Sequence, residues 1–353
     1  MKFVILGSGG RENAFCRKLY SSDKNHRIYC ISSYINPQIE NMVSNYVVEK
    51  NLYQKESLFQ HISQIYYEEP DKTENMIVIP GSENFLECGI VDLLLAHNIT
   101  CIGPLKSQAM IETSKVFCRN YLKYNHLDSY QPQYFGIYNY DPKYLQSIFK
   151  NLNYRFVVKA DGLCGGKGVR VYDKDNYQEA LGYCQSLLSP TGDFYQPPKL
   201  LIEERLEGQE FSLISIGDGK TTRHFPCVQD YKDLEAGSHL KTGGMGSVIL
   251  DNHSFPFLEL ADIEECQQLN HKIMENLSRD SEIGYRGFLY GGFMKTSHGV
   301  KLIEYNARMG DPECLNIMSL VDFNLSSLFL RIINNSLKEI KDTDDLFQFK
   351  NLY

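Results

Sequence analysis

Long apolar segments are missing from this 353-residue sequence, in which no uninterrupted stretch approaches the roughly 20 residues that a membrane span requires. The N-terminal apolar run is short and ends at Gly7, so we interpret it as a first β-strand and not as a secretory signal. Both absences lead us to expect a cytoplasmic protein with no membrane partner.

An excess of positive charge is also missing. The formal net charge is −8, and the Lys and Arg residues are spread along the chain. Nucleic-acid backbones require a concentrated basic surface, so we expect no nucleic-acid partner. Small phosphorylated ligands remain compatible with this composition, because a pocket for them needs only a few local cations.

Zinc-binding patterns are absent too. None of the ten cysteines forms Cys-x-x-Cys, and none of the nine histidines belongs to a His-Glu-x-x-His motif. We therefore expect no structural zinc site, and scattered cysteines suit a reducing compartment. The hydrophobic content of 42% and the charged content of 23% are typical of a folded protein, and the length predicts about two or three domains.

Strand-like and helix-like segments alternate in the N-terminal third of the chain. Short apolar or β-branched runs ended by turn residues predict strands, and helical stretches lie between them. The predicted strands are 2–6, 27–32, 75–80 and 99–103, and the helical stretches include 11–21 and 54–67. This alternation predicts a parallel, doubly wound sheet.

The pattern changes farther along the chain. A helical pattern covers about 106–124, and the Pro-, Tyr- and Asn-rich segment 130–142 is interpreted as a link into a second domain. From 155 onward strand-like runs predominate, which predicts a mostly antiparallel sheet with flanking helices, an α+β arrangement. Residues 188–198 are predicted to form a loop.

The segment "VVKADGLCGGKGV" (157–169) contains the glycines and lysines of a phosphate-binding loop. It does not have the spacing of the Gly-x-x-x-x-Gly-Lys-Ser/Thr pattern. Lys159 is predicted to end one strand and Lys167 to begin the next, and the glycines between them allow backbone amides to approach a ligand closely. We interpret the segment as a hairpin that carries lysines over a nucleotide; the alternative is an exposed hairpin with incidental lysines.

Two earlier segments follow predicted strands. "GSGGRE" (7–12) opens a helix, where unpaired amides and the helix dipole favour an anion, although a bare tight turn is the alternative. The dinucleotide fingerprint requires glycine where this chain has Glu12, which disfavours a nucleotide-dependent dehydrogenase. Glu83, in "PGSENF", is expected at the same sheet edge as Arg11, where open α/β sheets bind small ligands.

The segment "LLIEERLEGQEFS" (200–212) is interpreted as a strand, a polar bend and another strand. Glu203, Glu204 and Glu210 are candidates for binding an adenine amine and ribose hydroxyls. Taken alone, such a segment is more often a solvated hairpin.

The segment "KLIEYNARMGDPE" (301–313) is the richest in candidate chemistry. Glu304 and Asn306 are two positions apart and face one side of a predicted strand, which gives an oxygen pair suited to Mg²⁺. Arg308 continues that face and could meet a transferring phosphoryl group. Without the neighbouring motif residues, a Glu-x-Asn pair would have a structural role at least as often as a metal-binding one.

Taken in order, these motifs resemble those of an ATP-grasp ligase and, more narrowly, of the glycinamide ribonucleotide synthetase (phosphoribosylamine–glycine ligase) family. The matching segments are collinear from residue 3 to about 325 and include "GSGGRENA", "GSENFLECGIVD", "ETSKVF", "VVKADGLCGGKGV", "IEERLEGQEFS", "TGGMG", "GFLYGG" and "IEYNARMGDPE". The glycine-rich segment together with "NARMGDPE" is specific to this family among ATP-grasp enzymes.

The resemblance implies a fold with two parts. Residues 1–104 are expected to form an N-terminal substrate-binding domain with a doubly wound parallel sheet. Residues 105–330 are expected to form an ATP-grasp fold with a glycine-rich lid subdomain at about 128–205. Residues 331–353 are expected to be a tail, with the further C-terminal domain of the family absent.

The resemblance also implies a reaction. The family uses ATP to join glycine to 5-phosphoribosylamine in purine biosynthesis, by phosphorylating the glycine carboxylate and letting the amine attack the acyl phosphate. ATP and Mg²⁺, with Mn²⁺ as a substitute, are the implied cofactors, and glycine and phosphoribosylamine are the implied small-molecule partners. A protein partner is one way in which a shortened chain would compensate for the missing domain.

The resemblance assigns roles to residues by position. The implied nucleotide-binding residues are Lys115, Lys159, Lys167, Glu203, Leu206 and Glu210. The implied catalytic residues are Arg308, Lys167 and Asp230, and the implied Mg²⁺ ligands are Glu304 and Asn306. The implied substrate contacts are Gly9, Gly10, Arg11, Glu12, Glu83, Arg308, Asp311 and Pro312.

Some positions depart from the family pattern. Asn13 stands where the family usually has His, and Tyr231 and Asp233 stand in place of the His and Arg of "QDHKR". These positions concern the acceptor more than the nucleotide. Two alternatives therefore stay open: an ATP-grasp ligase with a different acceptor, and a non-catalytic ATP-binding relative.

Overall fold

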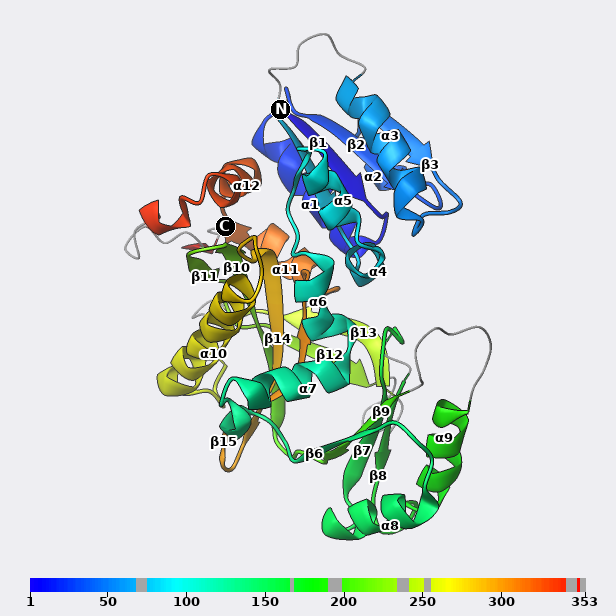
Figure 1. Ribbon diagram of the computed structural model, residues 1–353. Coiled ribbons are helices and arrows are strands. Elements are labelled where there is room, and N and C mark those ends of the chain that lie inside the picture. Colours follow the sequence, from blue (N-terminus) through cyan, green and yellow to red (C-terminus); the bar gives the residue numbers. More distant parts are fainter. Residues whose placement is uncertain are drawn as a thin grey trace.

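A five-stranded parallel sheet forms the N-terminal part of the protein, drawn in blue and cyan in the computed structural model of Figure 1. The model describes residues 1–67, 75–165, 168–189, 199–233, 241–250, 255–340 and 348–349. The strand order is β3-β2-β1-β4-β5. The strands are β1 (Lys2–Leu6), β2 (Arg27–Ser32), β3 (Asn45–Val48), β4 (Met76–Pro80) and β5 (Thr100–Cys101).

The central strands β1 and β4 are buried along their whole length, because helices cover both faces of the sheet. Alternate residues enter different cores: Val4 packs with the helix that contains Leu58, whereas Phe3 packs with the helix that contains Phe15. The helices are α1 (Gly10–Ser22), α2 (Pro37–Glu40), α3 (Lys55–Tyr67), α4 (Glu83–Cys88) and α5 (Ile90–Ala96). The predicted doubly wound sheet is confirmed.

The predicted helical pattern over about 106–124 is confirmed, and it forms two helices. It is divided into α6 (Lys106–Thr113) and α7 (Lys115–Tyr124), with Ser114 extended between them. The Ser114 side chain accepts a hydrogen bond from the Phe117 amide at 3.1 Å, so it acts as the N-cap of α7. The chain therefore turns at this serine, and α7 lies against the sheets that follow.

A four-stranded antiparallel sheet, in green at the bottom of Figure 1, has the order β6-β9-β7-β8. It lies in the segment for which a lid is expected, and we refer to it as the lid sheet. Its elements are β6 (Tyr134–Ile137), α8 (Pro142–Asn151), β7 (Phe156–Ala160), β8 (Val169–Tyr172), α9 (Glu179–Leu188) and β9 (Leu200–Glu204). The interpretation of 130–142 as a link is wrong for β6, which pairs with β9 as an edge strand. Most of the predicted loop at 188–198 lies outside the described residues.

A second antiparallel sheet, with the order β11-β10-β14-β15, lies between the other two in Figure 1. Its strands are β10 (Gln209–Asp218), β11 (Thr222–His224), β14 (Arg286–Thr296) and β15 (Gly299–Asn306). A two-stranded ribbon, β12 (Gln229–Asp233) and β13 (Lys241–Val248), lies beside it, and α10 (Leu260–Arg279) packs against β10 and β14. The predicted α+β arrangement is confirmed.

The C-terminal segment returns to the N-terminal part of the protein. It comprises α11 (Glu313–Leu320), β16 (Val321–Asp322), α12 (Leu325–Ile333), the 3-10 helix η2 (Leu337–Glu339) and β17 (Gln348–Phe349). Helices α11 and α12 pack against α1, and Phe329 joins Phe3 and Phe288 in one core. The N-terminal sheet and the second antiparallel sheet therefore share apolar cores. None of the helices in the described ranges is both long and apolar enough to cross a membrane.

Candidate active site

A cavity of about 680 Å³ lies where the lid sheet, β15 and the N-terminal domain meet. Most of the predicted site residues line it, and they are Arg11, Glu83, Lys115, Lys159, Glu203, Leu206, Glu210, Asp230, Glu304, Asn306, Arg308 and Asp311. Gly9, Gly10, Glu12 and Pro312 are described but do not line the cavity, and Lys167 lies outside the described residues. Folding thus gathers residues from the whole chain into one site.

A buried carboxylate between two cations forms the lid end of the cavity. Strands β7 and β9 are antiparallel neighbours, which places Lys159 and Glu203 diagonally on one face. Lys159 Nζ lies 2.5 Å from Glu203 Oε2, and Arg119, from α7, donates to Oε1 through its Nε. Burial would raise the pKa of Glu203, but Arg119 and Lys159 lower it to about 2.

The same two cations reach strand β15. Arg119 Nη2 donates to the Ile303 carbonyl oxygen at 2.7 Å, and Lys159 Nζ donates to it at 3.3 Å. These contacts tie α7, the lid sheet and β15 together. Sequence reasoning missed Arg119; the signal was its position four residues after Lys115, which places both on one face of α7.

The glycine-rich segment is anchored on the start of α7. The Asp161 carboxylate accepts hydrogen bonds from the Val116 amide at 3.1 Å and from Ser114 Oγ at 2.9 Å, and Lys115 Nζ donates to the Gly162 carbonyl oxygen at 2.9 Å. Gly162 has a φ of +89°, a conformation that side-chain-bearing residues rarely adopt, although the space around it is open. The backbone conformation, and not crowding, requires glycine there.

Glu304 and Asn306 lie on the face of β15 that lines the cavity. They supply a carboxylate oxygen and an amide oxygen, and Asn306 Oδ1 also accepts from Arg308 Nη2 at 3.2 Å. In the described part of the chain, no group of three or more His, Cys, Asp or Glu residues could hold a metal ion. The carboxylate oxygen and the amide oxygen are two hard donors that fit Mg²⁺, which commonly takes one or two protein ligands and completes its shell with phosphates and water.

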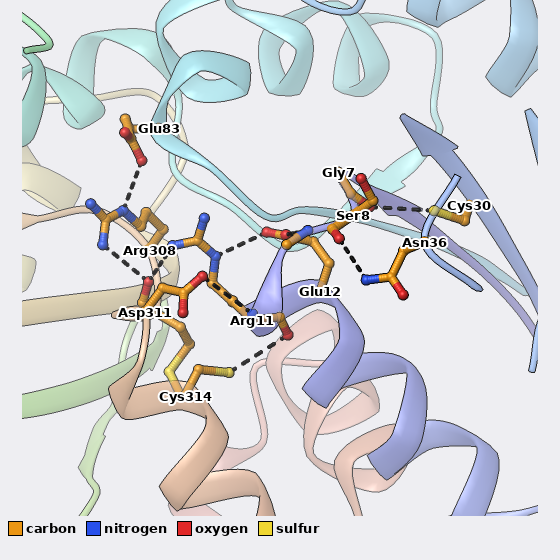
Figure 2. A network of polar contacts seen from close by, with 12 residues as sticks. Gly7, Ser8, Arg11, Glu12, Cys30, Asn36, Glu83, Arg308, Asp311 and Cys314 are labelled. Atoms are coloured by element: carbon orange, nitrogen blue, oxygen red, sulfur yellow. Dashed lines mark hydrogen bonds and ion pairs between the residues drawn. The ribbon is translucent and has the colours of Figure 1, made fainter. Parts of the chain in front are cut away.

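Arg308 connects β15 to the N-terminal domain (Figure 2). Its Nε lies 3.1 Å from Glu83 Oε2. Its Nη2 lies 2.9 Å from Glu112 Oε1. The other Glu112 oxygen accepts a hydrogen bond from the Ala307 amide at 2.7 Å. Sequence reasoning missed Glu112, because nothing in its local pattern indicates a partner almost two hundred residues away.

Burial and pairing move the pKa values of these carboxylates in opposite directions. Burial raises the pKa of Glu112 to about 7, even though Arg308 counteracts it. Burial also raises the pKa of Glu83, but Arg308 and Arg11 lower it overall. The carboxylates hold the pKa of Arg308 above its usual range, so its guanidinium stays charged.

Arg11 makes a second connection between the domains (Figure 2). Its Nη1 donates to the Met309 carbonyl oxygen at 2.9 Å, and Arg308 Nη1 donates to the same oxygen at 3.2 Å. Asp311 Oδ2 accepts from the Arg11 amide at 3.4 Å, so a carboxylate of the protein lies at the N-terminus of α1. The predicted anion position on this helix is next to an acidic side chain.

Both carboxylate oxygens of Glu12 are engaged within the N-terminal domain. Oε2 accepts from the Gly9 amide at 2.6 Å, and Oε1 accepts from Arg11 Nε at 3.0 Å. A Cβ at Gly81 would lie 1.9 Å from Oε1, so this buried carboxylate also requires glycine on the neighbouring loop. Glu12 therefore caps its own helix and orients Arg11.

Among the described side chains that depart from the family pattern, those of Asn13 and Tyr231 make none of the contacts given above. Asn13 Nδ2 donates to Gln38 Oε1 at 3.0 Å, and Asn13 Oδ1 accepts from Arg17 Nε at 3.0 Å. Tyr231 is exposed, and the side chain of Asp233 lies outside the described residues. Asp230 is buried and lines the cavity.

Comparison with known proteins gives consistent results across the chain. The phosphoribosylglycinamide synthetase N domain matches residues 1–112, and the ATP-grasp (A) domain of the same synthetase matches residues 113–314. The phosphoribosylamine–glycine ligase of Methanocella arvoryzae is 33% identical over 346 residues, which are 97% of this chain and 75% of that protein.

Solved structures agree with these matches. The phosphoribosylamine–glycine ligase of Thermotoga maritima has a TM-score of 0.70 at 25% identity, covering 95% of this chain and 76% of that one. A biotin carboxylase–ATP analogue complex from Campylobacter jejuni has a TM-score of 0.71 at 13% identity, covering 98% of this chain and 73% of that one, a likeness of fold alone. The chain therefore belongs to the phosphoribosylglycinamide synthetase family and has the ATP-grasp fold.

Proposed function

We propose that this protein is an ATP-dependent ligase that joins glycine to 5-phosphoribosylamine and releases ADP and phosphate. The observation that carries the proposal is that the family match covers both sides of the cavity, the lid end as well as the end at the N-terminal domain. The curated relatives that match almost all of this chain are named phosphoribosylamine–glycine ligases.

The reaction balances in two steps. A glycine carboxylate oxygen attacks the γ-phosphorus of ATP, which forms glycyl phosphate and releases ADP. The amine nitrogen of phosphoribosylamine then attacks the carbonyl carbon, phosphate leaves, and the amine loses a proton. The product is glycinamide ribonucleotide, as in the second step of de novo purine biosynthesis.

The lid end of the cavity suits the nucleotide. Lys115 and Lys159 would neutralise its phosphates, together with Lys167 of the glycine-rich segment. The Glu203 carboxylate is already engaged by two cations. The backbone of Glu203, together with Leu206, would therefore contact the adenine. Glu210, on β10, would bind the ribose.

The β15 end of the cavity suits the transfer itself. Glu304 and Asn306 would hold Mg²⁺, or Mn²⁺ in its place, and the bound cation would neutralise phosphate charge. Arg308 would stabilise the transferring phosphoryl group and the acyl phosphate, with Asp230 nearby. Arg11, Glu83 and Asp311 would meet phosphoribosylamine from the N-terminal side, and Glu12 would act by orienting Arg11.

In this proposal the two domains bind different substrates. We assign the acceptor to the N-terminal domain, residues 1–104, and ATP to the ATP-grasp domain, residues 105–330. The lid subdomain, at about 128–205, would close over the nucleotide. The matched relatives are longer than this chain, and this chain spans about three quarters of their length.

A coupled assay of ADP release tests the proposal. The enzyme is incubated with ATP, Mg²⁺ and glycine, with and without freshly prepared phosphoribosylamine. We expect ADP release to require both glycine and phosphoribosylamine and to disappear in Glu304→Ala. Glycine-dependent release that ignores phosphoribosylamine would reject the assigned acceptor, and the absence of any turnover would favour the non-catalytic relative.

A different acceptor is the second candidate, and it is motivated by the departures from the family pattern at Asn13, Tyr231 and Asp233. The position that usually carries His in this family is engaged here with Gln38 and Arg17 at the start of the acceptor domain. An amine other than phosphoribosylamine that restores ADP release in the same assay would identify this alternative.

A further inference from the structure

Arg119 is a buried guanidinium at the cavity for which the site described above has no assigned ligand role. Only 2% of the residue is exposed, yet it is among the residues that line the cavity. Two of its three nitrogens are engaged: Nε with Glu203, and Nη2 with the Ile303 carbonyl oxygen. The third nitrogen, Nη1, is buried and has no hydrogen-bond partner within the described residues.

An unpartnered buried donor of this kind is costly. Leaving a buried polar group without a partner is unfavourable, and more so when the group is charged. Native proteins therefore leave few such groups, and those at a cavity wall point to a ligand atom that completes them. The missing partner of Nη1 must be a hydrogen-bond acceptor, because a guanidinium has only donors.

The charge balance around Arg119 specifies the acceptor further. Arg119 and Lys159 share a single carboxylate, that of Glu203, and their other common partner is a neutral carbonyl group. Glu304, the residue after Ile303, also interacts electrostatically with Arg119 and helps to hold the pKa of Arg119 above its usual value. Lys115 adds another cation to the same cavity wall. An anionic oxygen would accept a charge-assisted hydrogen bond from Nη1 and be attracted to Arg119, Lys159 and Lys115, which makes it a stronger partner than a neutral ring nitrogen.

The shape of the side chain supports a binding role over a merely structural one. Lys159 already compensates Glu203 from the lid, so a second cation is not needed to neutralise that carboxylate. A planar guanidinium presents its donors in a rigid plane, so it can hold a carboxylate, a carbonyl and a third acceptor in fixed directions. Arg119 is therefore held by its first two partners, and its third nitrogen is buried without one.

We propose that Arg119 is a nucleotide-binding residue whose Nη1 donates to a phosphate oxygen of the bound nucleotide, as a third cation beside Lys115 and Lys159. The inference rests on the proposed use of ATP, and it adds a residue of α7 to the phosphate site. Arg119 links that site to Glu203 of the lid and to Ile303 of β15, next to Glu304.

Binding measurements on the whole protein test this assignment. Adenosine, AMP, ADP and a non-hydrolysable ATP analogue are titrated by calorimetry into the wild type, Arg119→Lys and Arg119→Gln. We expect the dissociation constants of ADP and the ATP analogue to rise about 10-fold or more in both variants, since a charge-assisted hydrogen bond is lost. The affinity for adenosine should be unchanged, because adenosine has no phosphate.

Arg155→Gln is the matched control. Arg155 is another lid arginine paired with a glutamate, Glu207, but it lies on the exposed surface. Its replacement should leave the affinity for all four ligands unchanged. Thermal unfolding of each variant shows whether it is folded at the titration temperature, and Arg119→Lys retains the charge in case Arg119→Gln does not fold.

The outcomes separate this proposal from the proposed function. An equal loss of affinity for all four ligands in Arg119→Lys would mean that Arg119 only supports the pocket, and unchanged ADP affinity would mean that Nη1 meets no phosphate. Either result overturns the assignment while leaving the ligase proposal intact. If the wild type itself binds neither ADP nor the ATP analogue, the proposed use of ATP is rejected, and the assignment of Arg119 is rejected with it.

Discussion

The two ends of the cavity differ in how their charges are compensated. At the lid end, Arg119 and Lys159 share one carboxylate, and Lys115 donates only to a backbone carbonyl group. At the end that faces the N-terminal domain, Arg11 and Arg308 are paired with Glu12, Glu83 and Glu112. In these contacts, the three cations at the lid end are paired with one carboxylate, whereas the two arginines at the other end are paired with three.

This difference has a physical consequence for ligands. A polyanion such as a nucleotide can enter the lid end and complete contacts that are unfinished without it, so little reorganisation is needed. A ligand that approaches Arg308 must instead replace Glu83, Glu112 or Asn306 as a partner. We therefore expect the lid end to determine nucleotide affinity and the Arg308 end to determine chemistry.

Replacing Arg308 tests this division with the largest expected effect. In Arg308→Ala, kcat for ADP release should fall by about 10³-fold, because an arginine that stabilises a transferring phosphoryl group typically contributes that much. The dissociation constant of ADP should change little. Calorimetry and the coupled assay measure the two quantities, and a comparable loss in both would show that the two ends are not separable.

Replacing Glu203 tests the lid end through stability. Glu203→Gln leaves Arg119 and Lys159 buried without their shared carboxylate, so the free energy of unfolding should fall by about 3 kcal/mol. Urea denaturation measures it. Glu204→Gln, on the same strand but exposed, is the control and should change it by less than about 0.5 kcal/mol. Equal effects of the two changes would contradict the shared role of Glu203.

The pH dependence of stability tests the Arg308 end through Glu112. Its pKa is about 7 in the folded protein, above the usual value of 4.5, so the folded state retains a proton that the unfolded state releases. The stabilisation from this group is therefore present below pH 4.5 and is lost as the pH rises toward 7.

The comparison with Glu112→Gln isolates that effect. The difference in unfolding free energy, wild type minus Glu112→Gln, should decrease by about 2 kcal/mol between pH 5 and pH 7. Urea denaturation at several pH values provides the measurement. A difference that stays constant or increases with pH would mean that Glu112 is charged throughout this range.

The smallest expected effect concerns the anchor of the glycine-rich segment. Asp161→Ala removes the carboxylate that accepts from Ser114 and Val116, so the free energy of unfolding should fall by about 1 kcal/mol, the usual value of a helix cap. The affinity for ADP should fall as well, because the loop beside Lys115 loses its anchor. Unchanged ADP affinity would show that the loop is positioned without Asp161.

Local sequence patterns were sufficient for much of the fold. Strands β1 and β4 were predicted because they are continuous apolar runs, and they are buried throughout. The half-exposed strand β3 was missed, because its apolar run is short, only Tyr46, Val47 and Val48. Strand β6 was read as a link, since its identity depends on pairing with β9, which lies some 65 positions farther along the chain.

In the candidate site, too, the residues that local sequence patterns did not reveal are those whose roles depend on distant segments. Lys115, Lys159, Glu203, Glu304, Asn306 and Arg308 were selected from motifs, and folding brings them to one cavity. Arg119 and Glu112 were not selected, because each appears in its helix as an ordinary charged residue. Their roles depend on partners from other segments, Glu203 and Ile303 for Arg119 and Arg308 for Glu112.

The sequence by itself determined the kinds of groups available and the local conformations that present them: buried strands, helix starts, and glycines where the backbone φ is positive. Its motifs also indicated the family. Only the tertiary structure decided which charges are compensated and which are left for a ligand. The strength of an interaction between two charges depends on their distance and burial. For Arg119 with Glu203, and for Arg308 with Glu112, the distance and the burial are set only when segments far apart in the sequence pack together.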